Sequence, residues 1–182
     1  MKDYADLLAN DPVYAERAKR FTDGVRDISE FLYERGAVAP RQPLPVTIAY
    51  HDACHLGHAQ GVRSQPRELL RGIPGLELRE IADADLCCGS AGIYNILNPV
   101  AARELGDRKA AEVLRTKAQL LVTANPGCLM QVASSVERTG ERIALAHTVE
   151  VLDASIRGFS VDSLGVSPTS TQASSTLQRG NR

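Results

Sequence analysis

Apolar residues along the middle of the chain form short runs that alternate with amphipathic or charged segments. Four β-rich or alternating runs predict strands: VTIAY (46–50), LELREI (76–81), AQLLVTA (118–124) and RIALA (142–146). The segments between and after them predict helices over 66–73, 99–117, 128–138 and 148–156. Strands that alternate with helices favour a parallel sheet. We therefore expect an α/β fold with a mostly parallel four-stranded sheet and helices on both faces.

The two ends of the chain carry other patterns. Residues 1–42 predict one amphipathic N-terminal helix and a linker, because Asp11 and Pro12 suit a helix start, Gly36 suits its end, and apolar residues recur between them at steps of three and four. That apolar stripe consists of Ala18, Phe21, Val25, Ile28 and Leu32. The Ser- and Thr-rich residues 159–182 predict a disordered tail. We expect three parts, 1–42, 43–158 and 159–182, with the N-terminal helix docked on the sheet.

Charge and composition narrow the classes of function. The net charge of −1 offers no basic surface for nucleic acid. No apolar run approaches the length of a membrane span, and the N-terminus lacks the apolar stretch of a secretory signal. We expect a cytoplasmic protein, which partners could hold at the inner face of the membrane. Since thiols stay reduced in the cytoplasm, the four cysteines favour a metal site or catalysis over disulfides.

Each cysteine follows the carboxyl end of a predicted strand. Cys54 comes four residues after the first strand, the adjacent Cys87 and Cys88 follow the second, and Cys128 comes four residues after the third. Parallel α/β sheets bind ligands beyond these strand ends. We therefore expect the four thiols to converge in one crevice.

Four converging thiols leave several kinds of site open. Zinc is one, although the chain lacks the paired C-x₂₋₄-C spacing typical of zinc sites. An iron–sulfur cluster is another, because it is larger than an ion and its separate irons can take ligands from adjacent residues on a bent loop. Gly89 would allow that bend, and its backbone N–H could bond to cluster sulfur. The remaining options are a strained disulfide between the adjacent cysteines and a Cys–His nucleophile at Cys54, beside His55 and His58.

Other residues near the strand ends suit supporting roles. We expect His51 and His55 to orient the Cys54 loop through hydrogen bonds. His147, after the fourth strand, suits either a supporting position near the thiols or the cap of the next helix. The charges of residues 102–117 are typical of a solvated helix face. The segment GSAG (89–92) lacks the G-x-G-x-x-G pattern, so we expect neither NAD nor a flavin to bind this chain.

Three segments of the chain together resemble the cysteine-rich CCG domain family. They are YHDACHLGHAQGVRSQPRELL, DLCCGSAGIYNI and VTANPGCLMQV, and the resemblance covers about residues 1–158. This domain occurs in heterodisulfide reductases and in related iron–sulfur proteins. The amino-acid sequences of all three segments are most similar to the C-terminal part of glycolate oxidase iron–sulfur subunits. The lactate-utilisation and anaerobic glycerol-3-phosphate dehydrogenase subunits resemble them next.

The resemblance implies a longer parent protein. In this family, CCG domains come as tandem copies after a ferredoxin-like segment, and residues 1–42 look like the connector that follows the first copy. Neither the ferredoxin-like runs nor a first copy is present here. We expect the chain to correspond to the C-terminal third of such a subunit, with the missing segments absent from a truncated product or carried on another chain.

The resemblance also implies the ligands of the site. Cys54, Cys87, Cys88 and Cys128 match the family's metal ligands. The full family pattern ends in C-x-x-C, but Gln131 stands where the last cysteine would be. Five cysteines accompany the non-cubane cluster of heterodisulfide reductase, so four favour an ordinary [4Fe–4S] cluster.

The role implied by the resemblance is electron transfer without a catalytic residue in this chain. We expect an iron–sulfur component of a glycolate-type 2-hydroxy-acid dehydrogenase, which passes electrons from an FAD-containing subunit to a quinone-type acceptor. One alternative is a heterodisulfide-reductase-like thiol/disulfide enzyme. Another is a structural module in which zinc or the bare thiols hold a subunit interface.

Overall fold

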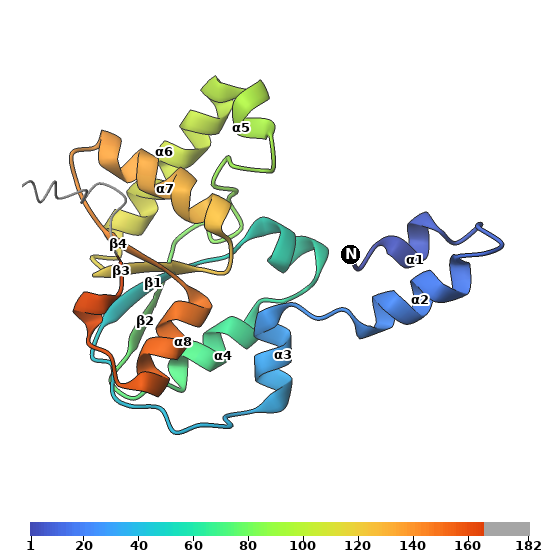
Figure 1. Cartoon of the computed structure of the whole chain (residues 1–182). Coiled ribbons are helices and arrows are strands. Elements are labelled where there is room, and N and C mark those ends of the chain that lie inside the picture. Colours follow the sequence, from blue (N-terminus) through green and yellow to red (C-terminus); the bar gives the residue numbers. More distant parts are fainter. Residues whose placement is uncertain (166–182) are drawn as a thin grey trace, which may run out of the picture.

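The computed structural model describes residues 1–165 and contains a four-stranded parallel sheet (Figure 1). Its strands are β1 (Thr47–His51), β2 (Glu77–Glu80), β3 (Leu120–Thr123) and β4 (Ala144–His147). They lie in the order β2-β1-β3-β4, and every neighbouring pair is parallel. The predicted fold class and all four predicted strands are confirmed.

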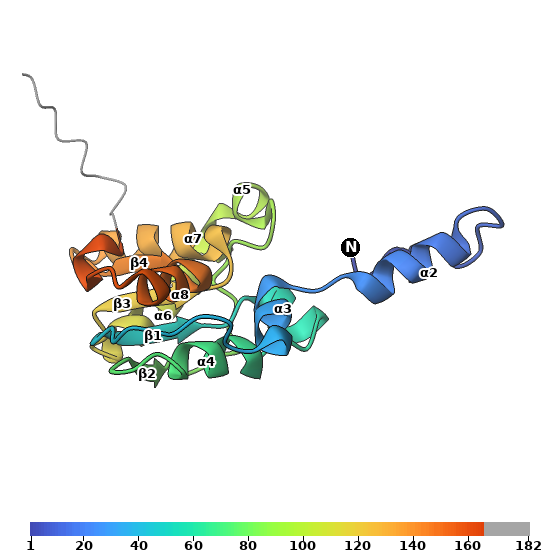
Figure 2. The ribbon, with the colours of Figure 1, turned by 60° about the horizontal axis from the view of Figure 1, so that its bottom comes forward.

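Helices cover both faces of the sheet, as expected (Figures 1 and 2). One face packs against α4 (Ser64–Arg71) and α8 (Thr148–Arg157), and the other packs against α6 (Pro99–Arg115) and α7 (Pro126–Arg138). The alternation within β1 decides the two sides, since Ile48 and Tyr50 belong to the first core and Ala49 to the second. The core therefore lies in two layers, one on each side of the central strands.

The strand order reverses direction between β1 and β3. From β1 the chain passes through α4 to β2 on one side, and from β3 it passes through α7 to β4 on the other. Because α4 and α7 cover opposite faces, the chain segments leaving β1 and β3 diverge at their carboxyl ends. Such a divergence is the place where α/β sheets bind ligands.

The expectation that the charges of residues 102–117 form a solvated helix face is wrong for one residue of α6. Most of its charged side chains are exposed, but Lys109 is fully buried, at 0% exposure. Lys109 shares the buried stripe of α6 with Ala102, Gly106 and Val113, at steps of four, three and four residues. That stripe is visible in the sequence, but the surrounding charges conceal it.

The N-terminal region is not the single helix that the stripe predicts. It forms α1 (Tyr4–Leu7), α2 (Ala15–Gly24) and α3 (Ile28–Arg35). The helix breaks after Gly24 because Asp27 begins a new one, with its side chain and that of Glu30 forming a capping box. The expected stop at Gly36 is confirmed. The expected helix start at Asp11 and Pro12 is wrong, because α2 begins at Ala15 with Tyr14 at its N-cap. The Asp11 carboxylate instead accepts from the backbone N–H groups of Val13 and Tyr14 in the turn before that helix.

Only part of this region docks on the sheet domain. α3 packs against α4, whereas α1 and α2 pair with each other in an arm that points away from the body (Figures 1 and 2). Within that arm the rings of Tyr4 and Phe21 pack at a tilt of 60° with their centroids 5.8 Å apart, and Phe21 remains about half exposed. The expectation that the whole N-terminal helix docks is therefore wrong for residues 1–24.

The folded part of the chain extends past the expected boundary at residue 158. Residues Val161–Ser163 form the short 3-10 helix η2, and Val161 and Leu164 pack against the first core. The disorder expected for the rest of the tail concerns residues 166–182, which lie outside the described residues. Within residues 1–165, none of the helices is both long and apolar enough to cross a membrane.

Candidate functional site

The four cysteines meet at one cavity at the carboxyl ends of the strands. The cavity has a volume of about 290 Å³. Its lining consists of Cys54, His55, Cys87, Cys88, Ser90, Ala91, Gly92, Asn125 and Cys128. Three loops that are distant in sequence supply the thiols, and all four cysteines are free. The predicted convergence is confirmed, and we call this group of four cysteines the cysteine site.

Cys54 lies at the start of a single-turn π-helix, η1 (His55–Ala59), which the sequence does not signal. The Ala53 carbonyl accepts hydrogen bonds from the backbone N–H groups of both Leu56 and Gly57, each at 2.9 Å. The next turn is held by Arg63, which donates to the Gly57 carbonyl and to the Asp85 carboxylate. Because Asp85 belongs to the segment leading to Cys87, Arg63 ties two of the cysteine-bearing loops together.

The loop of residues 82–92, which we call the CCG loop, is pressed against α6. Gly89 has a φ of +89°, and a Cβ there would overlap the Ala102 carbonyl oxygen. Its backbone N–H points back and donates to the Cys87 sulfur at 3.4 Å. On α6, a Cβ at Gly106 would overlap the Ser135 hydroxyl of α7, and the Cys88 carbonyl would lie in ordinary contact with it at 3.4 Å. The bend expected at Gly89 is present, and the close approach of the CCG loop to the backbone of α6 requires glycine at that position.

Cys128 lies in the first turn of α7, directly after its cap. The Asn125 side chain accepts from the Cys128 backbone N–H at 3.1 Å and also lies 3.3 Å from the His55 ring. His55 therefore joins the Cys54 loop to the start of α7, and its role in supporting the thiols stays a prediction.

The thiols of Cys54, Cys87 and Cys88 lie in an environment that disfavours their charged form. Burial raises the pKa of Cys54 to about 11, and its hydrogen bond with Cys87 adds to the rise. The hydrogen bond with Cys128, together with burial, raises the pKa of Cys88 to about 11. The hydrogen bond with Cys88, followed by burial, also raises the pKa of Cys87 well above its usual range. In the metal-free site the thiols of Cys54, Cys87 and Cys88 are therefore protonated at neutral pH, and a metal must displace their protons to bind.

His51 is the buried histidine of the site. It is 1% exposed, and neither of its ring nitrogens has a hydrogen-bond partner. Its ligand atom and the sulfurs of Cys88 and Cys128 all lie within 4.8 Å of one another. Burial lowers the pKa of His51 to about 4, so the ring is neutral and could give a lone pair to a metal shared with Cys88 and Cys128. The expectation that His51 orients the Cys54 loop through hydrogen bonds is wrong, because its ring makes none.

The size of the site distinguishes a single ion from a larger group. A tetrahedral zinc ion with Zn–S bonds of about 2.3 Å needs its ligand atoms about 4 Å apart. Among the described residues, His51, Cys88 and Cys128 are the set of three whose ligand atoms all lie within 4.8 Å of one another, and Cys54 and Cys87 are not part of that set. A cavity of about 290 Å³ is also several times the roughly 30 Å³ that a water-sized ligand occupies. Four thiols spread around this volume fit an iron–sulfur cluster, whose separate irons each take one cysteine.

Two other residues singled out in the sequence lie outside the cavity lining. His147 caps α8 by accepting from the Val149 backbone N–H, and Glu150 completes the capping box. Of the two roles expected for His147, the structure therefore shows the cap. Gln131 donates to the Ala102 carbonyl at 3.1 Å and accepts from Asn95 at 3.5 Å. The residue at the position of the absent cysteine thus joins α7 to α6 and to α5 (Tyr94–Leu97).

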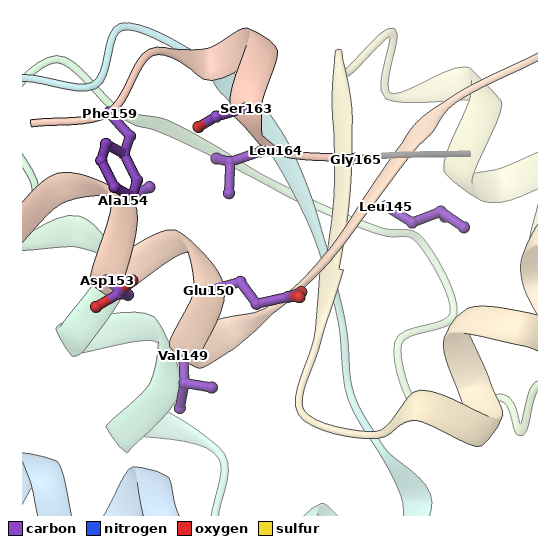
Figure 3. Close-up of a pocket in the computed structure, with 9 residues that line it drawn as sticks. All are labelled: Leu145, Val149, Glu150, Asp153, Ala154, Phe159, Ser163, Leu164 and Gly165. Atoms are coloured by element: carbon purple, nitrogen blue, oxygen red, sulfur yellow. The ribbon is translucent and has the colours of Figure 1, made fainter. Parts of the chain in front are cut away.

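A second cavity, of about 580 Å³, lies away from the thiols. It is formed by β4, α8 and the segment after α8 (Figure 3). Its lining consists of Leu145, Val149, Glu150, Asp153, Ala154, Phe159, Ser163, Leu164 and Gly165. Besides two carboxylates and one hydroxyl, its lining is apolar and contains no cysteine. The thiol ligands predicted from the sequence therefore lie at the other cavity, the cysteine site.

Comparisons with known proteins agree with this location of the site. Residues 48–133, which hold all four cysteines, match the model of the family described as CCG, cysteine-rich domain. The chain is 39% identical over 156 residues to the probable glycolate oxidase iron-sulfur subunit of Bacillus subtilis, which covers 84% of this chain and 35% of the relative. It is 31% identical over 152 residues to lactate utilization protein A of Halalkalibacterium halodurans, covering 83% of this chain and 62% of the relative. The chain thus spans about a third of the first relative and less than two thirds of the second.

Proposed function

Residues 48–133 form a cysteine-rich domain of the CCG family, and from this premise we propose that the chain is the cluster-binding, electron-transfer part of an oxidoreductase that acts on a 2-hydroxy acid. The observation that carries the proposal is the meeting of four cysteines from three separate loops at one cavity. That cavity lies where the chain segments leaving β1 and β3 diverge, the usual ligand position in this type of sheet.

We assign Cys54, Cys87, Cys88 and Cys128 as the ligands of a [4Fe–4S] cluster, one sulfur to each iron. When bound, such a cluster takes up and gives back one electron at a time. The chain's own residues would bury the sulfurs, bend the CCG loop at Gly89, and direct the Gly89 N–H at the Cys87 sulfur. Hydrogen bonds to ligand sulfur are a recognised control of cluster potential.

The partners follow from what this chain lacks. None of the residues lining the cysteine site suits hydride transfer, so an FAD-containing subunit would oxidise the hydroxy acid and a quinone-type acceptor would receive the electrons. The relatives support this assignment by their names, an iron-sulfur subunit of glycolate oxidase and a lactate utilization protein. Ferredoxin-like and first-CCG segments would belong to the part of the relatives that this chain does not span. Such partners would also hold the chain at the inner face of the membrane.

A single zinc ion on His51, Cys88 and Cys128 is the second proposal, favoured by their mutual spacing within 4.8 Å. In that case the chain would be a structural module. Thiol/disulfide enzymology of the heterodisulfide-reductase type receives less support, because Gln131 replaces the fifth cysteine and its side chain bonds to α6 instead of lining the cavity.

The decisive experiment is metal analysis of the protein purified without oxygen. We expect about four irons and four sulfides per chain, with a broad visible absorption band that bleaches on reduction. Colourless protein with one zinc per chain would overturn the cluster assignment.

Two variants separate the cluster from the single zinc ion. Cys54→Ser and Cys87→Ser each remove a ligand of the four-cysteine cluster but none of the His51–Cys88–Cys128 group. We expect both variants to lose most of the iron, whereas a single zinc site would survive in both. His147→Asn is the matched control, because His147 caps α8 outside the cavity lining and its loss should leave iron content unchanged.

A further inference from the structure

Lys109 is a buried cation beside the cysteine site. Its side chain is 0% exposed in the middle of α6. The ammonium donates to the Asp83 carbonyl at 2.7 Å and to the Ala84 carbonyl at 3.5 Å, so it is fixed to the start of the CCG loop. Asp83 adopts a left-handed backbone with φ +51°, and the bond from Lys109 holds that strained residue in place.

This ammonium has no carboxylate partner at contact distance. Within residues 1–165, none of the ion pairs closer than 4 Å involves Lys109. A buried charge without a counter-charge is costly, and lysine is rarely fully buried unless paired. Two carbonyl oxygens accept from two of its three N–H groups and carry no net charge, so none of the contacts within 4 Å neutralises the ammonium.

The negative charge is available from the cysteine site. Lys109 lies on the same buried face of α6 as Gly106, beside which the Cys88 carbonyl packs, and its ammonium binds carbonyls of the loop that carries Cys87 and Cys88. Burial lowers the pKa of Lys109, and the charges of Cys54, Asp52, Asp83 and Cys88 act in the opposite direction. Its own charge in turn helps to lower the pKa of His51. The ammonium is therefore within electrostatic reach of two of the four thiols and of the buried histidine.

We propose that Lys109 is the fixed counter-charge of the cysteine site, offsetting the negative charge of the thiolates and favouring the reduced state of the group they hold. The inference rests on the proposed function for its redox part. Four cysteine thiolates give a bound [4Fe–4S] group a net negative charge, and one added electron increases that charge by one. A buried cation nearby stabilises the more negative state more than the less negative one, because the interior screens charges weakly.

The test replaces Lys109 with methionine, which matches its length, removes the charge and is well tolerated in an interior. Arg108→Met is the matched control, because Arg108 is the neighbouring residue on α6, is exposed, and removes the same unit of charge. Wild type and both variants are poised at a series of potentials, and the visible bleaching gives the ratio of reduced to oxidised cluster. We expect that ratio to fall about tenfold at a fixed potential in Lys109→Met and to be nearly unchanged in Arg108→Met.

A second readout uses the metal-free protein and does not depend on the cluster. Iodoacetamide alkylates thiolates, so its rate at Cys54 at pH 8 reports the charge that Lys109 contributes. If Lys109 is the counter-charge, the rate falls several-fold in Lys109→Met and not in Arg108→Met. If Lys109 only anchors the loop, its loss loosens the loop, exposes the thiol and raises the rate.

The two readouts keep this inference distinct from the proposed function. If the wild-type protein contains no iron and sulfide, the assignment of a cluster is wrong, but the alkylation rates of the metal-free protein still decide the role of Lys109. An alkylation rate that stays constant or rises in Lys109→Met would overturn the counter-charge. So would an unchanged ratio of reduced to oxidised cluster in a variant with full iron content and a wild-type circular dichroism spectrum.

Discussion

Arg67 holds the Asp52 carboxylate with two guanidinium nitrogens, each 2.7 Å from a different oxygen. Asp52 is buried and comes two residues before Cys54, between the end of β1 and the π-helix. The same guanidinium lies over the Tyr50 ring, 4.8 Å from its centroid, and also binds Glu80 at the end of β2. One side chain of α4 therefore fixes the point at which the chain leaves the central strand towards the cysteine site.

Arg67→Met should destabilise the protein by about 3 to 5 kcal/mol, because it leaves the buried Asp52 carboxylate without a counter-charge. Urea unfolding followed by circular dichroism measures the loss. Arg71→Met is the control on the same helix, since its pairs with Glu68 and Glu80 are about half exposed and should cost less than about 1 kcal/mol. Equal losses in the two variants would show that the Asp52 pair has no special weight.

Gly89→Ala should distort the CCG loop, because the new methyl group would overlap the Ala102 carbonyl and the backbone is left-handed. We expect a loss of about 2 to 5 kcal/mol from strain and overlap together, with a parallel loss of bound metal. Gly92→Ala is the matched control: its φ is +64°, but its Cβ would meet open space, so only about 1 kcal/mol should be lost. Urea titrations of both variants decide whether the contact with α6 matters beyond the backbone conformation.

Gln131→Ala should lower the free energy of unfolding by about 1 kcal/mol, since it removes the amide that donates to the Ala102 carbonyl. Iron content should be nearly unaffected, because Gln131 does not line the cavity. The adjacent Met130 is 74% exposed, and Met130→Ala should be neutral for both properties. A large loss of iron in Gln131→Ala with unchanged stability would place the side chain at the cluster instead.

Tyr50 should make the protein sensitive to alkali. Burial, followed by the charge of Asp52, raises its pKa well above the ordinary value of about 10, so the unfolded chain loses the phenolic proton first as the pH rises. The unfolded state then binds fewer protons than the folded state, and stability falls with rising pH above about 10.

Tyr50→Phe removes that contribution and keeps the ring beneath Arg67. At about pH 11 wild type should have lost about 1 kcal/mol more than the variant, relative to pH 8. The raised pKa values of the Cys54 and Cys88 thiols also weaken the metal-free protein above pH 9, but equally in both proteins. Urea midpoints at the two pH values give the difference, and parallel curves would contradict the expectation.

The strands and the convergence of the cysteines were predictable because they depend on local patterns. Short β-rich or alternating runs predicted the strands. Because the strands are parallel, their carboxyl ends lie at one edge of the sheet, and each cysteine follows one of those ends in the sequence. The cap of α7 by Asn125 is also local, since Asn–Pro before a helix is a standard start.

Other features depended on packing between distant segments. The burial of Lys109 arises where α6 meets the CCG loop, and a lysine among exposed charges gives no sign of it except its place on the Ala102–Gly106–Val113 stripe. The break of the N-terminal helix did have a local signal, the Asp27-x-x-Glu30 capping box. The regular spacing of apolar residues across that point nevertheless predicted one continuous helix. The lack of hydrogen-bond partners for both ring nitrogens of His51 also could not be predicted, because it depends on how the sheet and its covering helices pack around the ring.

The delivery of the four sulfurs by three loops has a consequence for the whole fold. A group bound to all of them would act as a cross-link, closing one loop of chain between Cys54 and Cys87 and another between Cys88 and Cys128. Closing loops of this length removes conformational entropy from the unfolded chain, as disulfides do. Loss of the bound group would then lower the free energy of unfolding of the central strands as well as that of the site, so the group at the edge of the sheet would also stabilise the folded protein.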